Sequence, residues 1–345
     1  MDNIEQQFLQ LVNIVSNLQQ RVIALENTNH VLLQSNNQLI KMIESNQSEA
    51  EWIRRNLYYE INDPRNARQE LFYPIIETAE NTIEEIVNNR KSLARFGDGE
   101  FSAIAGRIRH KFQTVVDEQL KQRLLEILNC EEEMLMVGIA DNYGSLEKYS
   151  EQTQREIRCY LSPQIRDEHM HLLNPEKKYY DAYVTRPYII YADNQSDAPA
   201  IRFMNLKRIW DNRDCVFVEG CYTGLGVGND LFENANTIKR ILCPAENAFL
   251  RYDEILDTCM KQDKDSLFLL ALGPTATVLA YDLCRAGYQA VDIGHADLEY
   301  EWFIQGEGRR TPVAGKYNNE WNGEMQLEPI EDEEYRKQVV AEIGV

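Results

Sequence analysis

The sequence lacks any run approaching about 18 apolar residues, so it offers no transmembrane helix. Residues 1–7 are acidic and polar, with neither the basic start nor the apolar core of a signal peptide. The seven cysteines include no Cys-x-x-Cys pair, which argues against a zinc ribbon or a disulfide framework. We therefore expect a cytoplasmic protein with reduced, mostly buried thiols, and leave open a peripheral association with the inner face of the membrane.

Positive charge is also scarce, because 36 lysines and arginines stand against 56 aspartates and glutamates. The resulting net charge of −20 argues against duplex nucleic acid as a partner, since binding to its phosphates depends on clustered Lys and Arg. An acidic protein can still bind a phosphorylated metabolite where a metal ion, a local arginine or a helix N-terminus supplies positive charge. The 43% of hydrophobic residues excludes wholesale disorder.

Residues 4–43 carry a heptad pattern that no glycine or proline interrupts. The d positions are Ile4, Leu11, Leu18, Leu25, Leu32 and Leu39, and the a positions are Phe8, Val15, Val22, Asn29, Asn36 and Ile43. A narrow apolar seam of this kind is buried only against other helices. We therefore predict that residues 1–60 form a coiled-coil stem through which the protein associates with itself.

The number of chains in this coiled coil stays open. Valine at a with leucine at d favours a parallel dimer, and asparagine at a sets the register. Additional apolar residues at e and g are Val12, Ile14, Leu33, Ile40 and Met42. Their bulk is also compatible with a trimer, or with an amphipathic helix packed on the rest of the protein. The helix is expected to continue beyond residue 45 and to break at residues 62–64, before Pro64.

Residues 65–330 read as apolar strands that alternate with helices. The predicted strands are 91–96, 134–139, 215–218, 239–243, 266–272 and 288–293, with a β-rich stretch at 182–191. The predicted helices are 71–89, 120–128, 230–236, 248–260 and 275–286. This alternation predicts an α/β fold with a Rossmann-like, doubly wound, mostly parallel sheet that binds ligands at the carboxyl ends of its strands. Residues 331–345 are expected to be an acidic C-terminal tail or helix.

The end of the first predicted strand carries two carboxylates, Asp98 and Glu100, each preceded by a glycine, Gly97 or Gly99. The two side chains converge if the backbone turns tightly, which glycine tolerates. Hard oxygen ligands in such a loop suit Mg²⁺ or Mn²⁺, which would bridge them to a nucleotide diphosphate. The alternative is an ordinary surface turn, because Asp-Gly is a frequent turn dipeptide.

A glycine-rich segment, residues 218–230, lies between a predicted strand and a predicted helix. Its glycines Gly224, Gly226 and Gly228 alternate, so the segment is neither a dinucleotide fingerprint nor a Walker loop. Backbone N–H groups before a helix favour an anion, which makes a phosphate or sugar cradle plausible. Close packing of the helix on the strand is the alternative.

Two further strand ends carry polar residues. The first has Gly273, Pro274 and Thr275 before a helix, where the threonine caps the helix or binds a ligand. The second has His295, which is flanked by acidic residues and is a candidate general base, metal ligand or phosphate donor. A structural histidine is the alternative.

Six blocks together resemble the GT-D-type glycosyltransferases, once catalogued as a domain of unknown function. They are RFGDGE at 95–100, VTRPYI at 184–189, VEGCYTGLGVGNDLF at 218–232, KRILCPAENAF at 239–249, LALGPTATVLAYDL at 270–283 and GYQAVDIGHADLEYEWF at 287–303. They occur in the family's order, and the resemblance covers about residues 70–320 but not the stem. It implies a Rossmann-like domain that binds a nucleotide-sugar donor, typically UDP-linked, with a divalent metal.

The resemblance and the chemistry of the residues together give a set of predicted roles. The family's DxE motif matches Asp98 and Glu100, which we expect to hold Mn²⁺ or Mg²⁺ with His295 as a further ligand. His295 and Asp297 are the candidates for the base that deprotonates the acceptor hydroxyl. The expected donor-binding residues are Arg95, Phe96, Gly97, Gly99, Arg186, Thr223, Gly224, Gly226, Asn229, Gly273, Pro274 and Thr275.

The predicted reaction is transfer of a sugar from a UDP-sugar to a glycan, a glycoprotein or a lipid-linked saccharide. Metal stabilises the charge of the departing diphosphate without a proton donor. Two other classes stay open. One is another Rossmann-type transferase that uses a nucleotide ligand, and the other is a non-catalytic coiled-coil scaffold with a decayed enzyme domain.

Overall fold

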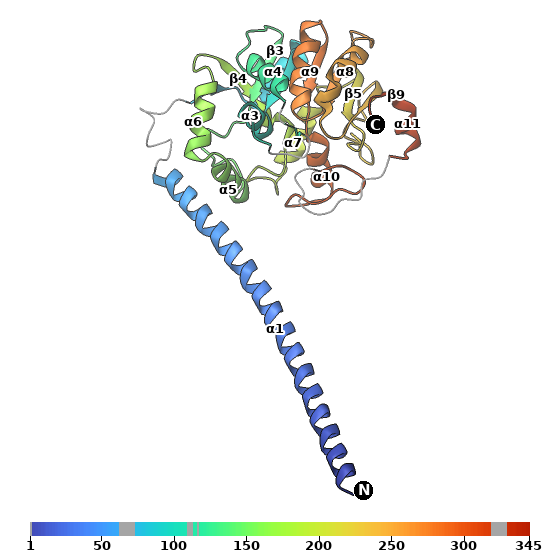
Figure 1. Ribbon diagram of the computed structural model, residues 1–345. Coiled ribbons are helices and arrows are strands. Elements are labelled where there is room, and N and C mark those ends of the chain that lie inside the picture. The colour runs from blue at the N-terminus through green and yellow to red at the C-terminus, as the bar shows by residue number, and fades with distance from the viewer. Residues whose placement is uncertain (1, 62–72, 109–112, 116, 319–329) are drawn as a thin grey trace. The chain divides into compact units, whose positions relative to one another are not determined.

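The computed structural model describes residues 2–61, 73–108, 113–115, 117–318 and 330–345 (Figure 1). The chain divides into two compact units, Met1–Ile61 and Asn62–Val345. This division coincides with the predicted end of the stem, while the predicted break at 62–64 itself lies outside the described residues. None of the helices within the described ranges has the length and apolar character needed to cross a membrane.

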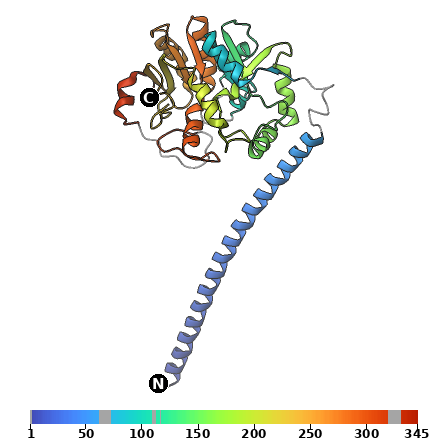
Figure 2. The ribbon, with the colours of Figure 1, turned by 180° about the vertical axis from the view of Figure 1, so that it is seen from behind.

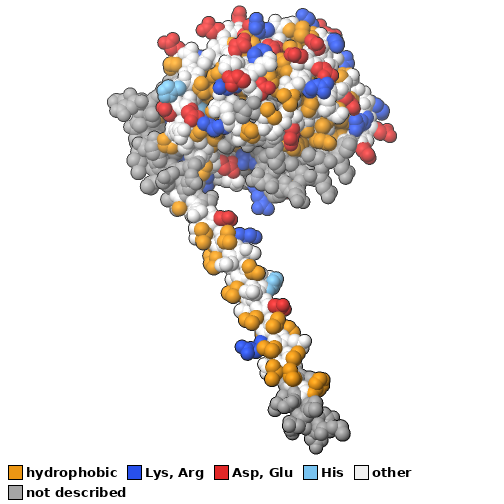
Figure 3. Space-filling view, in the orientation of Figure 1, with side chains coloured by type: hydrophobic (Ala, Val, Ile, Leu, Met, Phe, Trp, Pro, Cys, Tyr) orange, Lys and Arg blue, Asp and Glu red, His pale blue; other side chains and the backbone are white. Residues whose placement is uncertain are grey.

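The N-terminal unit is one helix of 60 residues, α1 (Asp2–Ile61), as the heptads predict. The apolar side chains of its predicted seam are about half exposed or more, from 49% for Val15 to 68% for Phe8 and Leu25. Figure 3 shows hydrophobic side chains along its described length. The side chains of Ile4 and Val12 lie outside what is described. An exposed seam on so long a helix is typical of a coiled-coil chain without its partner.

The second unit is built on a parallel sheet, as predicted. Its nine strands within the described residues are ordered β1-β4-β3-β2-β8-β7-β5-β6-β9. They are β1 (Ile75–Ile76), β2 (Ser92–Phe96), β3 (Leu135–Ile139), β4 (Lys178–Asp181), β5 (Asp214–Gly220), β6 (Thr237–Cys243), β7 (Leu267–Ala271), β8 (Gln289–Asp292) and β9 (Val339–Glu342). All of these pairings are parallel. Strands β2, β3, β5, β7 and β8 are almost wholly buried, which explains why they read as continuous apolar runs.

Helices cover both faces of the sheet. On one face lie α3 (Asp98–Ile104), α4 (Glu118–Leu128), α8 (Tyr252–Cys259) and α9 (Pro274–Arg285), which pack against one another and on the sheet. On the other lie α2 (Ala79–Asn88), α7 (Ala198–Lys207) and α10 (Ala296–Ile304). Helices α4, α8 and α9 are in front in Figure 1, and the opposite face is in front in Figure 2. This is the predicted doubly wound α/β arrangement.

The remaining elements complete the second unit. They are α5 (Glu151–Tyr160), α6 (Pro163–Leu172), α11 (Glu333–Gln338) and two short 3₁₀ helices, η1 (Ala182–Thr185) and η2 (Ala248–Arg251). Residues 331–345 therefore contain a helix and also add an edge strand, since β9 pairs with β6. Arg240 of β6 bonds Gln338 at 2.7 Å and ties this C-terminal segment to the sheet.

Three predictions of local structure were wrong. Ile75 and Ile76, predicted as helical, form strand β1, because they pair with β4 at the edge of the sheet. Residues 182–191, predicted as β-rich, begin with η1 and continue without a strand, because the strand β4 lies just before them. Residues 230–236, predicted as a helix, form turns. The glycine-rich segment is therefore not followed directly by a helix.

Candidate active site

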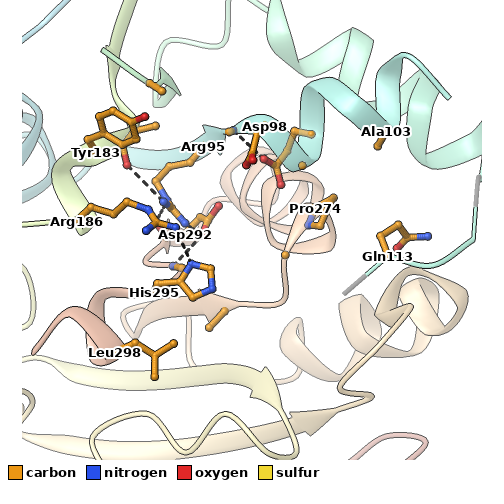
Figure 4. A pocket seen from close by; sticks show the side chains of 18 of the residues that line it. Arg95, Asp98, Ala103, Gln113, Tyr183, Arg186, Pro274, Asp292, His295 and Leu298 are labelled. Atoms are coloured by element: carbon orange, nitrogen blue, oxygen red, sulfur yellow. Dashed lines mark hydrogen bonds and ion pairs between the residues drawn. The ribbon is translucent and has the colours of Figure 1, made fainter. Parts of the chain in front are cut away.

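A cavity of about 550 Å³ lies at the carboxyl ends of the parallel strands, where the fold class predicts ligand binding (Figure 4). Its wall includes residues just after six strands, β2, β3, β4, β5, β7 and β8. Polar lining residues in these strands or in the segments that follow them include Arg95, Asp98, Glu100, Asn142, Tyr183, Arg186, Thr223, Asp292, His295 and Asp297. Strands β2 and β8 are neighbours in the sheet although far apart in sequence, so the residues after them meet in this cavity.

The Asp98 and Glu100 carboxylates begin a helix rather than lying in the expected loop. Gly97 is the N-cap of α3, and the Glu100 Oε2 atom accepts a hydrogen bond from the Gly97 N–H at 2.7 Å. Burial raises the pKa of Glu100 to about 7, against the opposing effect of the Gly97 hydrogen bond. A group with this pKa gains its negative charge readily when a cation is close.

These residues fit a divalent metal ion. Asp98 and Glu100 both line the cavity, and hard carboxylate oxygens are the ligands that Mg²⁺ and Mn²⁺ prefer. No group of three or more His, Cys, Asp or Glu with metal-binding geometry occurs in the described parts of the chain. The structure thus does not bring His295 together with the two carboxylates as a third ligand. The protein would supply two carboxylates, with the remaining positions left for substrate phosphates and water, as is common for Mg²⁺.

Arg95 joins the two central strands beneath the cavity. Its guanidinium bonds the Asp292 Oδ1 atom at 2.6 Å, the Asp292 carbonyl at 2.7 Å and the Thr185 hydroxyl at 2.8 Å. A Cβ added to Gly294, which has a φ of +45°, would lie 2.0 Å from the Arg95 Nη2 atom, so only glycine fits there. Arg95, predicted to bind the donor, lines the cavity, but its hydrogen bonds go to the protein, which favours a structural role.

Arg186 and His295 come together at one side of the cavity (Figure 4). The Arg186 Nη2 atom lies 3.2 Å from the His295 Nδ1 atom. Because arginine can only donate, Nδ1 is the acceptor and the proton of a neutral imidazole sits on Nε2. Arg186 also lies 3.7 Å from Glu299, a fully buried carboxylate that accepts hydrogen bonds from the Tyr188 and Ile189 N–H groups.

Asp297 is committed to the protein interior. It is 1% exposed and accepts hydrogen bonds from the Gly226 N–H at 3.0 Å, the Asn229 amide at 2.8 Å and the Lys316 ammonium at 2.6 Å. The Asn229 amide and Lys316 also bond Glu301, at 2.7 and 2.8 Å. This buried cluster fastens the glycine-rich segment to helix α10, and it does not favour Asp297 as a base.

The glycine-rich segment is a packing element rather than an anion cradle over most of its length. The Leu225 N–H is bonded to Glu219, as the Gly226 N–H is to Asp297. Gly224 and Gly226 have φ values of +59° and +73°, and a Cβ on either would lie 2.7 Å from a neighbouring side chain, Ile330 or Phe232. Close packing, the alternative that the sequence left open, therefore explains why glycine occurs at these two positions.

The predicted donor-binding residues divide into two groups. Those that line the cavity are Arg95, Gly97, Gly99, Arg186, Thr223, Gly273 and Pro274. Phe96, Gly224, Gly226, Asn229 and Thr275 are not among its lining residues. Phe96 and Thr275 are almost completely buried, because Phe96 belongs to strand β2 of the sheet and Thr275 to helix α9, which packs on it.

Sequence reasoning missed several polar residues of the wall. The Asn142 amide donates to the Tyr183 hydroxyl at 3.1 Å, while the Asn142 Oδ1 atom is buried and accepts no hydrogen bond from the described residues. The Gln113 amide donates to the Val115 carbonyl at 2.7 Å, and its Oε1 atom is likewise without a partner among them. Their positions after strands or in loops gave no periodic signal; a buried polar atom is visible only in the folded chain. Lys316, the partner of Asp297, was missed for the same reason.

A family model described as glycosyltransferase GT-D fold matches residues 93–321. The chain belongs to this family. The match contains every residue of the site described above and confirms the resemblance that the six sequence blocks carried. The stem lies outside the matched residues.

Solved structures of this GT-D family share the fold. A Streptococcus sanguinis protein described as a new glycosyltransferase is 35% identical, with a TM-score of 0.74 over 79% of this chain and 100% of its own. Another structure, described as a highly conserved domain of unknown function with a distinct glycosyltransferase fold, is also 35% identical. Its TM-score is 0.72, over 79% of this chain and 96% of its own.

Two curated relatives are longer proteins. The probable glycosyl transferase Gly of Streptococcus gordonii is 36% identical over 77% of this chain. Glycosyltransferase GlyD of Streptococcus pneumoniae serotype 4 is 37% identical over 78% of it. The matched part spans 38% and 32% of their lengths, so this chain corresponds to about a third of each.

Proposed function

We propose that this protein is a metal-dependent glycosyltransferase that transfers a sugar from a UDP-sugar to a saccharide acceptor, namely a glycan, a glycoprotein or a lipid-linked sugar. The observation that carries the proposal is the placement of Asp98 and Glu100. Both carboxylates stand on the first turn of α3, in the wall of a cavity at the carboxyl edge of the sheet. Membership of the GT-D family supports the same reading.

Asp98 and Glu100 would hold Mn²⁺ or Mg²⁺. The ion would supply a positive charge that stabilises the departing diphosphate as the glycosidic bond breaks. Glu100 favours the binding of a cation, because its buried carboxyl has a pKa of about 7 and is ionised more completely beside a positive charge.

The cavity has two chemically different sides. In the view of Figure 4, Gln113 lies on the opposite side of Asp98 from Tyr183. Val115, whose carbonyl accepts a hydrogen bond from Gln113, adds apolar wall to this side. We assign the base to it, since a uracil ring needs apolar contacts and its N3–H group needs an acceptor such as the Gln113 Oε1 atom. The diphosphate then lies near the start of α9 and α3, and the sugar points toward Tyr183.

The roles of His295 and Asp297 follow from their partners. With Arg186 at its Nδ1 atom, His295 presents an N–H donor at Nε2, which suits a phosphate oxygen better than proton abstraction. Arg186 and His295 therefore form a phosphate-binding pair in this proposal. Asp297 holds the glycine-rich segment through Lys316 and Asn229.

The stem is proposed to assemble the protein into a homo-oligomer, with a dimer favoured by its heptads. A cytoplasmic location is proposed as well. It is supported by the seven cysteines, all of which are free thiols.

Thermal stability in the presence of ligands tests the function. UDP with Mn²⁺ is expected to raise the Tm of the full chain, because a ligand that binds only the folded state stabilises it. S-adenosylmethionine and NAD are expected to leave the Tm unchanged. Stabilisation by either of them, without an effect of UDP and Mn²⁺, would favour the rival transferase class. Stabilisation by none of these ligands would favour the scaffold.

A substitution tests the metal site directly. Asp98→Asn keeps the shape of the side chain but removes the charge, so hydrolysis of UDP-sugars with Mn²⁺ is expected to fall by about a hundredfold or more. The matched control is Asp253→Asn, an exposed aspartate on the first turn of α8 outside the cavity. It removes the same charge from a helix start and is expected to leave turnover intact. Full activity of Asp98→Asn would contradict the metal assignment.

A further inference from the structure

Asn142 and Tyr183 form a polar pair in the cavity wall that the diphosphate and metal site does not use. Asn142 follows β3 and Tyr183 follows β4, and these two strands are neighbours on the side of β2 away from β8. Because β3 also pairs with β2, the pair stands beside the strand end that carries Asp98. Tyr183 lies on the same side of Asp98 as Arg186 (Figure 4).

The hydrogen bond within the pair determines what each group offers to a ligand. The Asn142 Nδ2 atom donates to the Tyr183 oxygen at 3.1 Å. The tyrosine oxygen is thus already an acceptor, and its own O–H hydrogen is directed elsewhere. Burial raises the pKa of Tyr183 to about 12, so the hydroxyl keeps this hydrogen at neutral pH.

The Asn142 carbonyl is the second half of the pair. Asn142 is only 8% exposed, and its Oδ1 atom accepts no hydrogen bond within the described residues. A buried carbonyl without a partner costs about 1–3 kcal/mol, so the fold leaves here an acceptor that a bound molecule would satisfy. The pair therefore presents one O–H donor and one C=O acceptor next to each other.

The donor is held in place by its surroundings. The Tyr183 ring packs edge-on against Tyr149, with 5.7 Å between the ring centroids. The Tyr183 N–H bonds the Asp181 Oδ1 atom at 2.7 Å, and Asp181 is 2% exposed. A group fixed in this way loses little freedom when it binds, which favours recognition of a specific partner.

We propose that Asn142 and Tyr183 form a subsite for the hydroxyl groups of a sugar ring. An alcohol both donates and accepts, so one hydroxyl or two adjacent ones satisfy the Asn142 carbonyl and the Tyr183 O–H together. An ionised phosphate has no hydrogen to give to the Asn142 carbonyl. The inference rests on the proposed glycosyl transfer, and it deepens it by assigning this side of the cavity to a sugar.

The test compares UDP with UDP-hexoses as ligands. Isothermal titration of the full chain with Mn²⁺ gives the Kd of UDP and of UDP-glucose, UDP-galactose and UDP-N-acetylglucosamine. For each UDP-hexose, the Kd of UDP divided by the Kd of that UDP-hexose measures how much the sugar adds to binding. Asn142→Ala and Tyr183→Phe are each expected to reduce this ratio by about threefold to tenfold, the effect of one hydrogen bond. The Kd of UDP is expected to stay within twofold.

A second arm identifies which sugar is recognised. Donor hydroxyls are recognised if the variants raise the KM for UDP-hexose when water is the acceptor. Acceptor hydroxyls are recognised if the variants change only the KM for an added acceptor, namely methyl glucoside, methyl galactoside or methyl N-acetylglucosaminide. Either result supports the subsite. If the double variant loses less than the product of the two single losses, both groups bind the same hydroxyl.

Tyr281→Phe is the matched control. Tyr281 lies on helix α9, and its hydroxyl donates to the Glu126 carboxylate at 2.9 Å. Tyr281 is not among the residues that line the cavity. This variant is expected to keep the wild-type ratio. Unchanged ratios and KM values in both site variants would overturn the subsite, as would an equal loss for UDP itself. A wild-type chain that binds no UDP would instead contradict the proposed function, and the inference with it.

Discussion

His169 is a buried histidine held between two tyrosine hydroxyls beside helix α3. Its Nδ1 atom lies 2.9 Å from the Tyr143 hydroxyl and its Nε2 atom 3.2 Å from the Tyr160 hydroxyl. The ring stacks on Phe101 of α3 with 3.9 Å between centroids. Burial lowers the pKa of His169 from 6.5 to about 4, so the folded protein keeps the imidazole neutral. Tyr160 lines the cavity, which links this histidine to the site.

This residue predicts a pH dependence of stability. Between pH 6.5 and 4 the unfolded chain takes up a proton on His169 that the folded chain does not, so the free energy of unfolding falls as the pH falls through this window. From pH 7 to pH 5 the wild type is expected to lose about 2 kcal/mol more than His169→Gln, which cannot titrate. Urea unfolding at the two pH values measures the difference. Parallel losses in both proteins would show that the histidine does not titrate in this way.

At the scale of elements, a cluster of buried charged residues connects the glycine-rich segment, residues 218–230, to helix α10. Lys316 is only 5% exposed and bonds both Asp297 and Glu301 of α10. Burial alone lowers the pKa of Lys316, but its bonds to the two carboxylates raise it overall. Helix α10 thereby fixes the segment that supplies Thr223 and Leu225 to the cavity wall.

Removing this lysine is expected to unsettle both elements. Lys316→Met leaves two carboxylates buried without their cation and is expected to lower the free energy of unfolding by about 3–5 kcal/mol. Lys337→Met is the control, because Lys337 pairs with Glu334 on the surface and contributes less than about 1 kcal/mol. Urea denaturation gives both values, and Lys316→Arg provides a variant that retains the charge. If Lys316→Met lowers the free energy of unfolding no more than the control does, the cluster does not hold the two elements together.

The whole molecule consists of the helix α1, whose apolar seam is exposed, and a second unit that contains the buried core and the cavity. Every residue that lines the cavity belongs to the second unit, Asn62–Val345. The first unit exposes its apolar seam along α1 and has no such site of its own among the described side chains. Assembly and ligand binding are therefore expected to be separable.

Deletion of residues 1–50 tests this separation. The truncated protein is expected to have the mass of a monomer by light scattering, whereas the full chain is expected to be a dimer. UDP and Mn²⁺ are expected to stabilise both proteins equally. An oligomeric truncated protein would show that the body contributes its own interface. A monomeric full chain would contradict the coiled coil.

Periodic and local features could be predicted from the sequence. Apolar strands buried on both faces, such as β5 and β7, read as continuous hydrophobic runs, and the α1 heptads repeat over many turns. The six sequence blocks around the strand ends were sufficient to recognise the GT-D family. Each of these signals lies within a short stretch of chain, so no knowledge of distant contacts is needed.

The tertiary structure alone decided which polar residues face the cavity and which face the protein. Asp297 and Asn229 looked like site residues because they stand in polar sequence blocks near strand ends, yet Lys316 donates to Asp297 and Asn229 donates to Glu301. Asn142 and Tyr183 gave no signal and yet meet in the wall. The role of a carboxylate or an amide depends on its partners and on its burial, and these come from chain segments far apart in sequence.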